Sequence, residues 1–183
     1  MTVGDRMTVT TVVGLDLSLT ATGIARASAG NPVLALDVIR TPLKGMDRLD
    51  YIDTEICRHI AIGVDLVVIE GYAFGRPNQA AHLGELGGII RHSLWSNGIR
   101  YVDVPPSNVK KYATGRGNAP KPDIRMEVYK RFGVDYADDN ACDAFVLAAM
   151  GLDALGHPLI AMPATHRVAL NKIVWPTIGE RAA

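Results

Sequence analysis

Two short apolar runs, each followed by an acidic residue, constrain the fold of this chain most strongly. Residues 8–15 are rich in β-branched side chains and precede Asp16, and residues 64–69 are almost entirely apolar and precede Glu70. Such runs are typical of buried strands. A carboxylate directly after a buried strand is costly to desolvate unless it is paired or bound to a cation. Because ligand sites in α/β sheets gather at the carboxyl ends of strands, the pattern predicts a site there.

The rest of the chain alternates between strand-like and helix-like patterns. Further strands are predicted over residues 22–27, 33–40 and 99–104, and helices over residues 47–62, 79–97, 123–132 and 140–155. The Gly- and Pro-rich residues 108–122 are expected to be mostly irregular, and the chain beyond Leu155 is expected to be extended. This order of elements predicts an α/β fold with a mixed central sheet flanked by helices on both sides.

Composition bounds the class of protein. A chain of 183 residues with 48% hydrophobic and 21% charged residues is typical of one soluble globular domain. No stretch approaches the roughly 18 uninterrupted apolar residues of a membrane span, so a cytoplasmic protein with no membrane partner is expected. Cys57 and Cys142 lie far apart without metal-ligand spacing and are expected to be free buried thiols, a disulfide being the alternative.

The charge of the chain is unevenly distributed. The formal net charge is zero, which on its face argues against a nucleic-acid partner. Residues 91–131, however, hold nine lysines and arginines against only three acidic residues. This excess is compatible with a nucleic-acid-binding surface, although a solvated basic face would give the same pattern.

Four acidic residues form the candidate metal site. Asp139 and Asp143 are four residues apart at the start of the last predicted helix, so they share a face. Taken singly, Asp139 could be a helix cap and Asp143 a first-turn acid that the helix dipole favours. Together with Asp16 and Glu70 they provide the oxygen ligands that suit Mg²⁺. Zinc is not expected, because the histidines are scattered without ligand spacing.

These segments resemble the RuvC family of Holliday-junction resolvases, which have the RNase H-like fold of the retroviral integrase superfamily. The matching segments are Gly-Leu-Asp-Leu-Ser at 14–18 with Thr-Gly-Ile-Ala at 22–25, Val-Val-Ile-Glu at 67–70, Pro-Ser-Asn-Val-Lys at 106–110 with Thr-Gly-Arg-Gly-Asn-Ala at 114–119 and a lysine at 121, and Asp-Asn-Ala-Cys-Asp-Ala at 139–144. In this order they cover about residues 10–152. Actin-like ATPases also begin with a strand, an acid and a hairpin, but the phosphate loops that they need are not found.

The resemblance implies roles for particular residues. It implies an RNase H-like nuclease domain over residues 1–155 and a C-terminal extension over residues 156–183. The implied catalytic residues and metal ligands are Asp16, Glu70, Asp139 and Asp143. They would hold two Mg²⁺ ions, for which Mn²⁺ can substitute, with Asp16 bridging them; one ion would activate water and the other would stabilise the leaving 3′ oxygen.

One departure from the family's pattern concerns the last motif. Many family members carry an acid where this chain has Asn140. Asp139, one residue earlier, is the favoured ligand because a carboxylate binds Mg²⁺ better than an amide does.

The resemblance also implies which residues contact DNA. They are Tyr72, Phe74, Lys110, Lys111, Arg116 and Lys121. The lysines and the arginine would neutralise phosphates, and the two aromatic side chains would wedge against unpaired bases at a branch point. Simple loop packing remains the alternative for Tyr72 and Phe74, as does a solvated surface position for Lys111.

The implied activity is that of a magnesium-dependent endodeoxyribonuclease. It would resolve four-way and other branched DNA by paired nicks that leave 5′ phosphates. A homodimer would match the two-fold symmetry of the junction, and the helix over residues 79–97, with Gly84, Gly87 and Gly88, is the expected interface. The alternatives are an RNase H-like nuclease on other branched or RNA–DNA hybrid substrates, a non-catalytic junction-binding protein, and an actin-fold ATPase.

Overall fold

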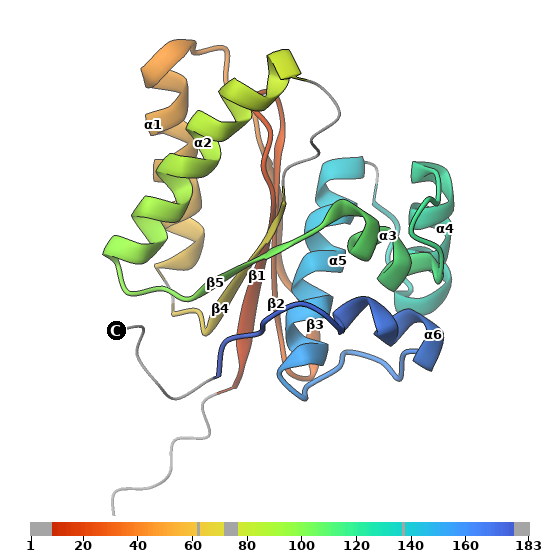
Figure 1. Cartoon of the computed structure of the whole chain (residues 1–183). Helices are drawn as coiled ribbons and strands as arrows, with labels where there is room; N and C mark the ends of the chain where they lie inside the picture. Colours follow the sequence, from red (N-terminus) through yellow and green to blue (C-terminus); the bar gives the residue numbers. More distant parts are fainter. Residues whose placement is uncertain (1–8, 62, 72–76, 137, 178–183) are drawn as a thin grey trace, which may run out of the picture.

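Five strands form one mixed sheet with helices on both faces (Figure 1). The computed structural model describes residues 9–61, 63–71, 77–136 and 138–177, and only the backbone of residues 77–82. The strands are β1 (Thr11–Asp16), β2 (Thr22–Ser28), β3 (Asn31–Ile39), β4 (Leu66–Glu70) and β5 (Tyr101–Val104). The helices are α1 (Gly45–Ile60), α2 (Pro77–Ser96), α3 (Pro106–Thr114), α4 (Lys121–Phe132), α5 (Asp139–Ala154) and α6 (Ala164–Arg167), followed by the 3₁₀ turn η1 (Val168–Leu170).

The sheet has the strand order β3-β2-β1-β4-β5. β1, β2 and β3 form an antiparallel meander, whereas β4 pairs with β1 and β5 pairs with β4 in parallel. The parallel pairs need crossover connections, and α1 and α2 provide them. The mixed sheet flanked by helices that the sequence predicted is therefore confirmed.

Successive residues of the central strands point to opposite faces of the sheet, and each face has its own core. Val13, Leu15, Val67 and Ile69 pack with the apolar stripes of α1 and α2. Val12, Leu66 and Val68 point the other way, into a core built on α5 with α3 and α4. Figure 1 shows α1 and α2 on one side of the sheet and α3 to α6 on the other. Along these strands, the alternation of side chains therefore fixes the face of the sheet to which each following residue points.

Helix α5 lies directly on the backbone of β1 and β2. A Cβ atom built on Gly14 would lie 2.0 Å from the Ala144 carbonyl oxygen, and one on Gly23 would lie 2.1 Å from the Asn140 carbonyl oxygen. Glycine is therefore required at both positions for steric reasons. The close approach brings the first turns of α5 beside the C-terminal end of β1.

Two expectations for irregular or extended segments were wrong. Residues 106–114 form helix α3, because prolines are tolerated in a helix's first turn and the apolar side chains of Val109 and Tyr112 are buried at helical spacing. Gly115, with φ 80°, ends α3, and α4 begins at Lys121. The C-terminal segment also contains α6 and η1, where an extended chain was expected.

Two smaller expectations were tested as well. Cys57 and Cys142 are both free thiols, as expected, but only Cys142 is buried, whereas Cys57 is half-buried. Within the part of the chain that the structure describes, no helix has the length and apolarity needed to cross a bilayer.

Candidate metal and nucleic-acid site

Asp16 and Glu70 lie side by side at one edge of the sheet. β1 and β4 are parallel neighbours in which Leu15 pairs with Ile69, so the residue after each reaches the same level. Because Leu15 and Ile69 point toward α1 and α2, the alternation directs Asp16 and Glu70 to the opposite face, where α5 lies. Their carboxyl groups are close enough to share a hydrogen bond when Asp16 is protonated and donates to Glu70.

Helix α5 adds a third carboxylate to this pair. Asp143 is only 7% exposed, as is Asp16. Burial, followed by the charges of Glu70 and Asp143, raises the pKa of Asp16 far above its ordinary value. Burial and the charge of Asp143 likewise raise the pKa of Glu70, and burial raises that of Asp143. Three acids that repel one another in a desolvated place are a costly arrangement unless positive charge is supplied.

Lys121 supplies one such charge from the first residue of α4. Its Nζ lies 3.6 Å from Asp143 Oδ2. Burial by itself would lower the pKa of Lys121, but the charges of Asp143, Asp16 and Asp139 outweigh it and raise that pKa. Lys110, on α3, is also close enough for its charge to lower the pKa values of Glu70 and Asp143. Two of the predicted phosphate contacts therefore face the acidic cluster.

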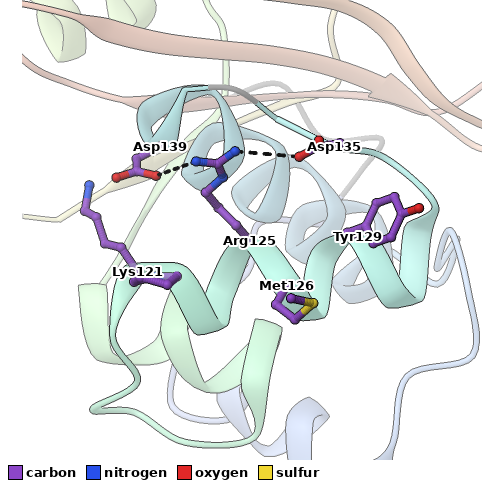
Figure 2. A pocket seen from close by; sticks show the side chains of 7 residues that line it. Lys121, Arg125, Met126, Tyr129, Asp135 and Asp139 are labelled. Atoms are coloured by element: carbon purple, nitrogen blue, oxygen red, sulfur yellow. Dashed lines mark ion pairs between the residues drawn. The ribbon is translucent and has the colours of Figure 1, made fainter.

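Asp139 lies at the rim of this cluster. Its side chain is 42% exposed, and its Oδ1 lies 3.9 Å from Arg125 NH1. Arg125 also lies 3.6 Å from Asp135. Figure 2 shows the Arg125 guanidinium between these two carboxylates, with the Lys121 amine beside Asp139. The structure thus separates a cluster of two buried acids and the half-buried Glu70 from a fourth acid that is half-exposed and neighbours Arg125.

An open cavity of about 520 Å³ lies next to this rim, between α4 and the start of α5 (Figure 2). Its wall carries two cations, two acids and the exposed side chains of Met126 and Tyr129. The lining residues are Lys121, Pro122, Arg125, Met126, Tyr129, Asp135 and Asp139. Cations beside an aromatic ring suit the phosphate and base of a nucleotide.

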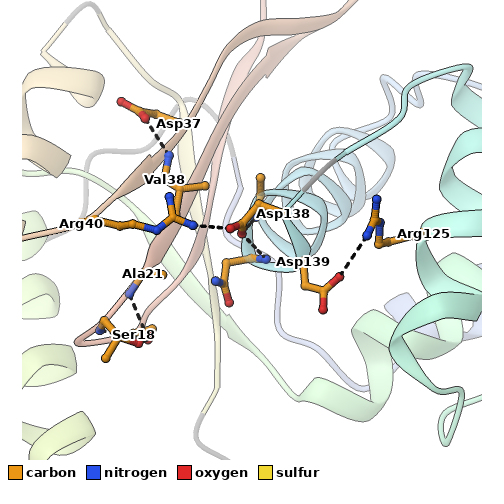
Figure 3. Close-up of polar contacts among 11 residues, drawn as sticks. Ser18, Ala21, Asp37, Val38, Arg40, Arg125, Asp138 and Asp139 are labelled. Atoms are coloured by element: carbon orange, nitrogen blue, oxygen red, sulfur yellow. Dashed lines mark hydrogen bonds and ion pairs between the residues drawn. The ribbon is translucent and has the colours of Figure 1, made fainter.

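Asp138, rather than Asp139, caps helix α5. Its Oδ1 accepts hydrogen bonds from the Asn140 and Ala141 amides, at 2.8 and 3.3 Å. Arg40, at the end of β3, forms an ion pair with the other oxygen (Figure 3). These donors outweigh burial and lower the pKa of Asp138. The alternative in which Asp139 is the cap is therefore wrong, and Asp139 is left free to face the cluster.

The remaining predicted DNA contacts lie farther out. Arg116 is exposed in the loop after α3 and pairs with Asp123 at 2.6 Å. Lys111 is half-buried in the last turn of α3, next to Lys110 in sequence but about 100° away around the helix. Tyr72 and Phe74 lie outside the described residues.

Three residues near the site were not singled out from the sequence. Arg125 belongs to the basic stretch, but only the fold shows its pairing with Asp139. Asp138 and Arg40 are 98 residues apart, and a contact across that separation leaves no local pattern. The one signal in the sequence for the role of Asp138 was that two adjacent acids precede an apolar helix. The first of them could cap the helix while the second binds a cation.

The donor set fits a hard divalent cation, although its present arrangement does not coordinate one. Among the residues that the structure describes, no three Asp, Glu, His or Cys side chains are placed so that they could hold a metal ion as they stand. Asp16, Glu70 and Asp143 offer only carboxylate oxygens, however, which Mg²⁺ prefers to nitrogen or sulfur. Coordination would require the Asp16–Glu70 hydrogen bond and the Lys121–Asp143 contact to rearrange.

A mixed β3-β2-β1-β4-β5 sheet with acids at the ends of β1 and β4 and on α5 defines the class as RNase H-like. Solved structures agree in fold. Thermus thermophilus RuvC superposes with a TM-score of 0.67 at 20% identity, over 80% of this chain and 97% of that one. A fowlpox virus Holliday junction resolvase gives a TM-score of 0.54 at 10% identity, over 79% of this chain and 99% of that one.

Sequence relatives identify the family. The crossover junction endodeoxyribonuclease RuvC of Rhodopirellula baltica is 30% identical over 166 residues, which cover 86% of this chain and 92% of the relative. The protein of the same name from Caldicellulosiruptor saccharolyticus is 30% identical over 147 residues, covering 75% of this chain and 89% of the relative. A comparison with models of known families gives no match. The chain belongs to the RuvC family of crossover junction endodeoxyribonucleases.

Proposed function

We propose that this chain is a structure-specific endonuclease that resolves Holliday junctions by paired, metal-dependent nicks. The convergence of Asp16, Glu70 and Asp143 on one edge of the sheet carries the proposal. Membership of the RuvC family supports a crossover junction as the substrate. A T. thermophilus RuvC of similar fold was solved with a Holliday junction substrate, which supports branched DNA as the partner. An intracellular, DNA-associated location follows from that substrate.

The proposed cofactor is Mg²⁺, with Mn²⁺ as a substitute. Asp16, Glu70 and Asp143 would hold it, with Asp139 contributing from the rim. Bound there, the cation would supply an acidified water and stabilise the charge that develops at the cut phosphodiester. The carboxylates act in this account as ligands and not as proton carriers, so loss of Asp16, Glu70 or Asp143 should be severe.

The basic residues position the DNA. Lys121 and Lys110 face the acids, so they are placed to bring a phosphate against the cluster and to offset its negative charge. Lys111 and Arg116 would contact phosphates farther along the strand. The cavity between α4 and α5 continues from the same rim and could take the strand as it leaves the acids.

A homodimer through α2 is part of the proposal. Gly84 and Gly88 are four residues apart, so they share a face of α2, and a Cβ on either would meet nothing within 4 Å. Trp95, two turns further on this face, is 66% exposed. Small residues beside an exposed aromatic ring suit close helix pairing. Gly88→Arg should therefore fold normally but shift the mass in light scattering from dimer to monomer; a monomeric native chain at micromolar concentration contradicts the dimer.

The test of the function is a cleavage assay on four-way, three-way, flap and RNA–DNA hybrid substrates with and without Mg²⁺. We expect Mg²⁺-dependent paired nicks in the four-way junction, and none from Asp16→Asn or Glu70→Gln, each of which should still bind the junction. Preferred cutting of flaps or hybrids would point to the alternative nuclease functions. Binding without any nicking in Mg²⁺ or Mn²⁺ would point to a non-catalytic junction-binding protein.

A further inference from the structure

The C-terminal segment, residues 156–177, folds back over helix α3, the helix that carries Lys110. Asn108 Nδ2 donates a hydrogen bond to the Ala169 carbonyl oxygen at 2.7 Å, and His166 Nδ1 lies 2.8 Å from the Tyr112 carbonyl oxygen. These contacts tie the first and last turns of α3 to α6 and η1. A carbonyl oxygen can only accept, so His166 carries its proton on Nδ1.

His166 occupies a tight place where α3 ends and the chain turns toward α4. Its side chain is 6% exposed. A Cβ on Gly115, which has φ 80°, would lie 3.1 Å from its Nε2, so the ring is packed against the backbone of the turn. Arg131 of α4 approaches the same nitrogen at 3.5 Å. One imidazole therefore contacts both helices that carry the cations facing the acids.

A buried carboxylate makes a second connection. Asp153, on α5, has a fully buried side chain. Its Oδ2 accepts a hydrogen bond from the Tyr112 hydroxyl at 3.0 Å, and its Oδ1 lies 3.0 Å from Arg167 NH2. Tyr112 belongs to α3 and Arg167 to α6. A fully buried carboxylate requires polar partners. These two contacts therefore fix α3 and the C-terminal segment against α5, the helix that also carries Asp143.

We infer that residues 156–177 are a brace that sets the position of α3 and the turn to Lys121 relative to the acids on α5. His166 and Asp153 are positioning residues in this account: they touch neither DNA nor metal, but hold the phosphate-contacting lysines at a fixed distance from the cutting site. The inference rests on the proposed function for the role of the lysines. The brace itself rests on the contacts of His166, Asp153 and Asn108 alone.

The test compares His166→Ala with two matched variants. His166→Asn keeps an N–H close to the position of Nδ1 and should restore the hydrogen bond to Tyr112. Thr165→Ala alters an exposed side chain of the same short helix and serves as the control. All three are measured as full chains at temperatures well below their unfolding transitions.

The first readout is amide hydrogen exchange, which needs no DNA. His166→Ala should speed exchange in the last turn of α3 and in the turn to α4, while His166→Asn and Thr165→Ala should leave it near the wild-type rate. Unchanged exchange in α3 of His166→Ala overturns the brace. This outcome is independent of whether the chain cuts junctions.

The second readout is junction binding and cutting. His166→Ala should raise KM and weaken binding in Ca²⁺ by roughly ten- to a hundredfold, as misplacement of distant supports can do, with little change in kcat. If His166→Ala showed faster amide exchange but bound the junction with wild-type affinity, the brace would have a purely structural role. That result would overturn its link to DNA binding. A fall in kcat alone would place His166 in the chemistry and also overturn it. A wild-type chain that neither binds nor cuts junctions would instead refute the proposed function.

Discussion

At the scale of the residue, the decisive feature is that Asp16, Glu70 and Asp143 share a desolvated place. Burial raises the pKa of each, and the charge of Asp143 raises the pKa values of Asp16 and Glu70 further, so the folded chain is less stable with all three ionised. Lys121 offsets part of this repulsion from 3.6 Å. Such stored repulsion is typical of functional sites, where stability is given up for chemistry.

This repulsion predicts a stabilising substitution. In EDTA at pH 8, Asp16→Asn should raise the free energy of unfolding by roughly 1–2 kcal/mol, the usual size of gains at strained functional positions. The pKa of Asp16 is raised from its ordinary value of 3.8, so the folded wild type binds more protons than the unfolded chain. Its contribution is therefore favourable below about pH 4 and is lost as the pH rises through the raised pKa.

Urea unfolding at pH 4 and pH 8 provides the measurement. The advantage of Asp16→Asn over wild type should be present at pH 8 and smaller at pH 4, where the carboxyl group of Asp16 is neutral in the folded chain because its pKa there is raised. Mg²⁺ should reduce the advantage at pH 8, because it stabilises only the intact acid set. A variant that is less stable than wild type at both pH values in EDTA would show that the acids do not repel one another.

At the scale of the element, the sequence predicted the central strands and their terminal acids, because burial on both faces leaves an apolar run that is visible in one dimension. It did not predict α3, because the surrounding Pro and Gly residues suggested a loop. The buried face of α3 is also too short to give a clear helical pattern of apolar residues. Nor did it predict the roles of Asp138, Arg40 and Arg125, which depend on contacts between distant elements. Asp143 was predictable through its spacing from Asp139, whereas Lys121 was predicted only as a phosphate contact and not as the partner of Asp143.

The close packing of α5 on the sheet leads to a prediction at this scale. Gly14→Ala places a methyl group 2.0 Å from the Ala144 carbonyl oxygen, so α5 must move away from β1. Overpacking of this kind costs roughly 1–3 kcal/mol, and here the displaced helix also carries Asp143. Chemical denaturation should show the lower stability, and junction cutting below the unfolding transition should fall as well. Wild-type values for both would mean that α5 does not rest on the β1 backbone.

At the scale of the whole molecule, the zero net charge conceals an asymmetry. The acidic cluster and its facing cations lie on the side of the sheet covered by α3 to α6, while α1 and α2 cover the other side (Figure 1). DNA should therefore approach from the α5 side. The sequence suggested this through its basic stretch, but only the fold shows that Lys110 and Lys121 face the acids.

The salt dependence of junction binding measures this asymmetry. Lys110→Gln should weaken binding in Ca²⁺ and reduce the slope of log K against log salt by about 0.9, the value for one lost phosphate contact. Arg58→Gln, at an exposed position of α1 across the sheet, is the matched control and should leave the slope unchanged. Equal slopes for all three proteins would place the DNA path elsewhere.

Calorimetric titration with Mn²⁺ at pH 8, without DNA, tests most directly whether the buried acids hold a divalent cation. The wild type should bind Mn²⁺ and release protons as the raised pKa values of Asp16 and Glu70 require. Asp16→Asn should weaken binding by more than the roughly 100-fold that loss of a ligand's supporting partner costs. Equal Mn²⁺ affinity for the wild type and Asp16→Asn would contradict the assignment of this cluster as the metal site.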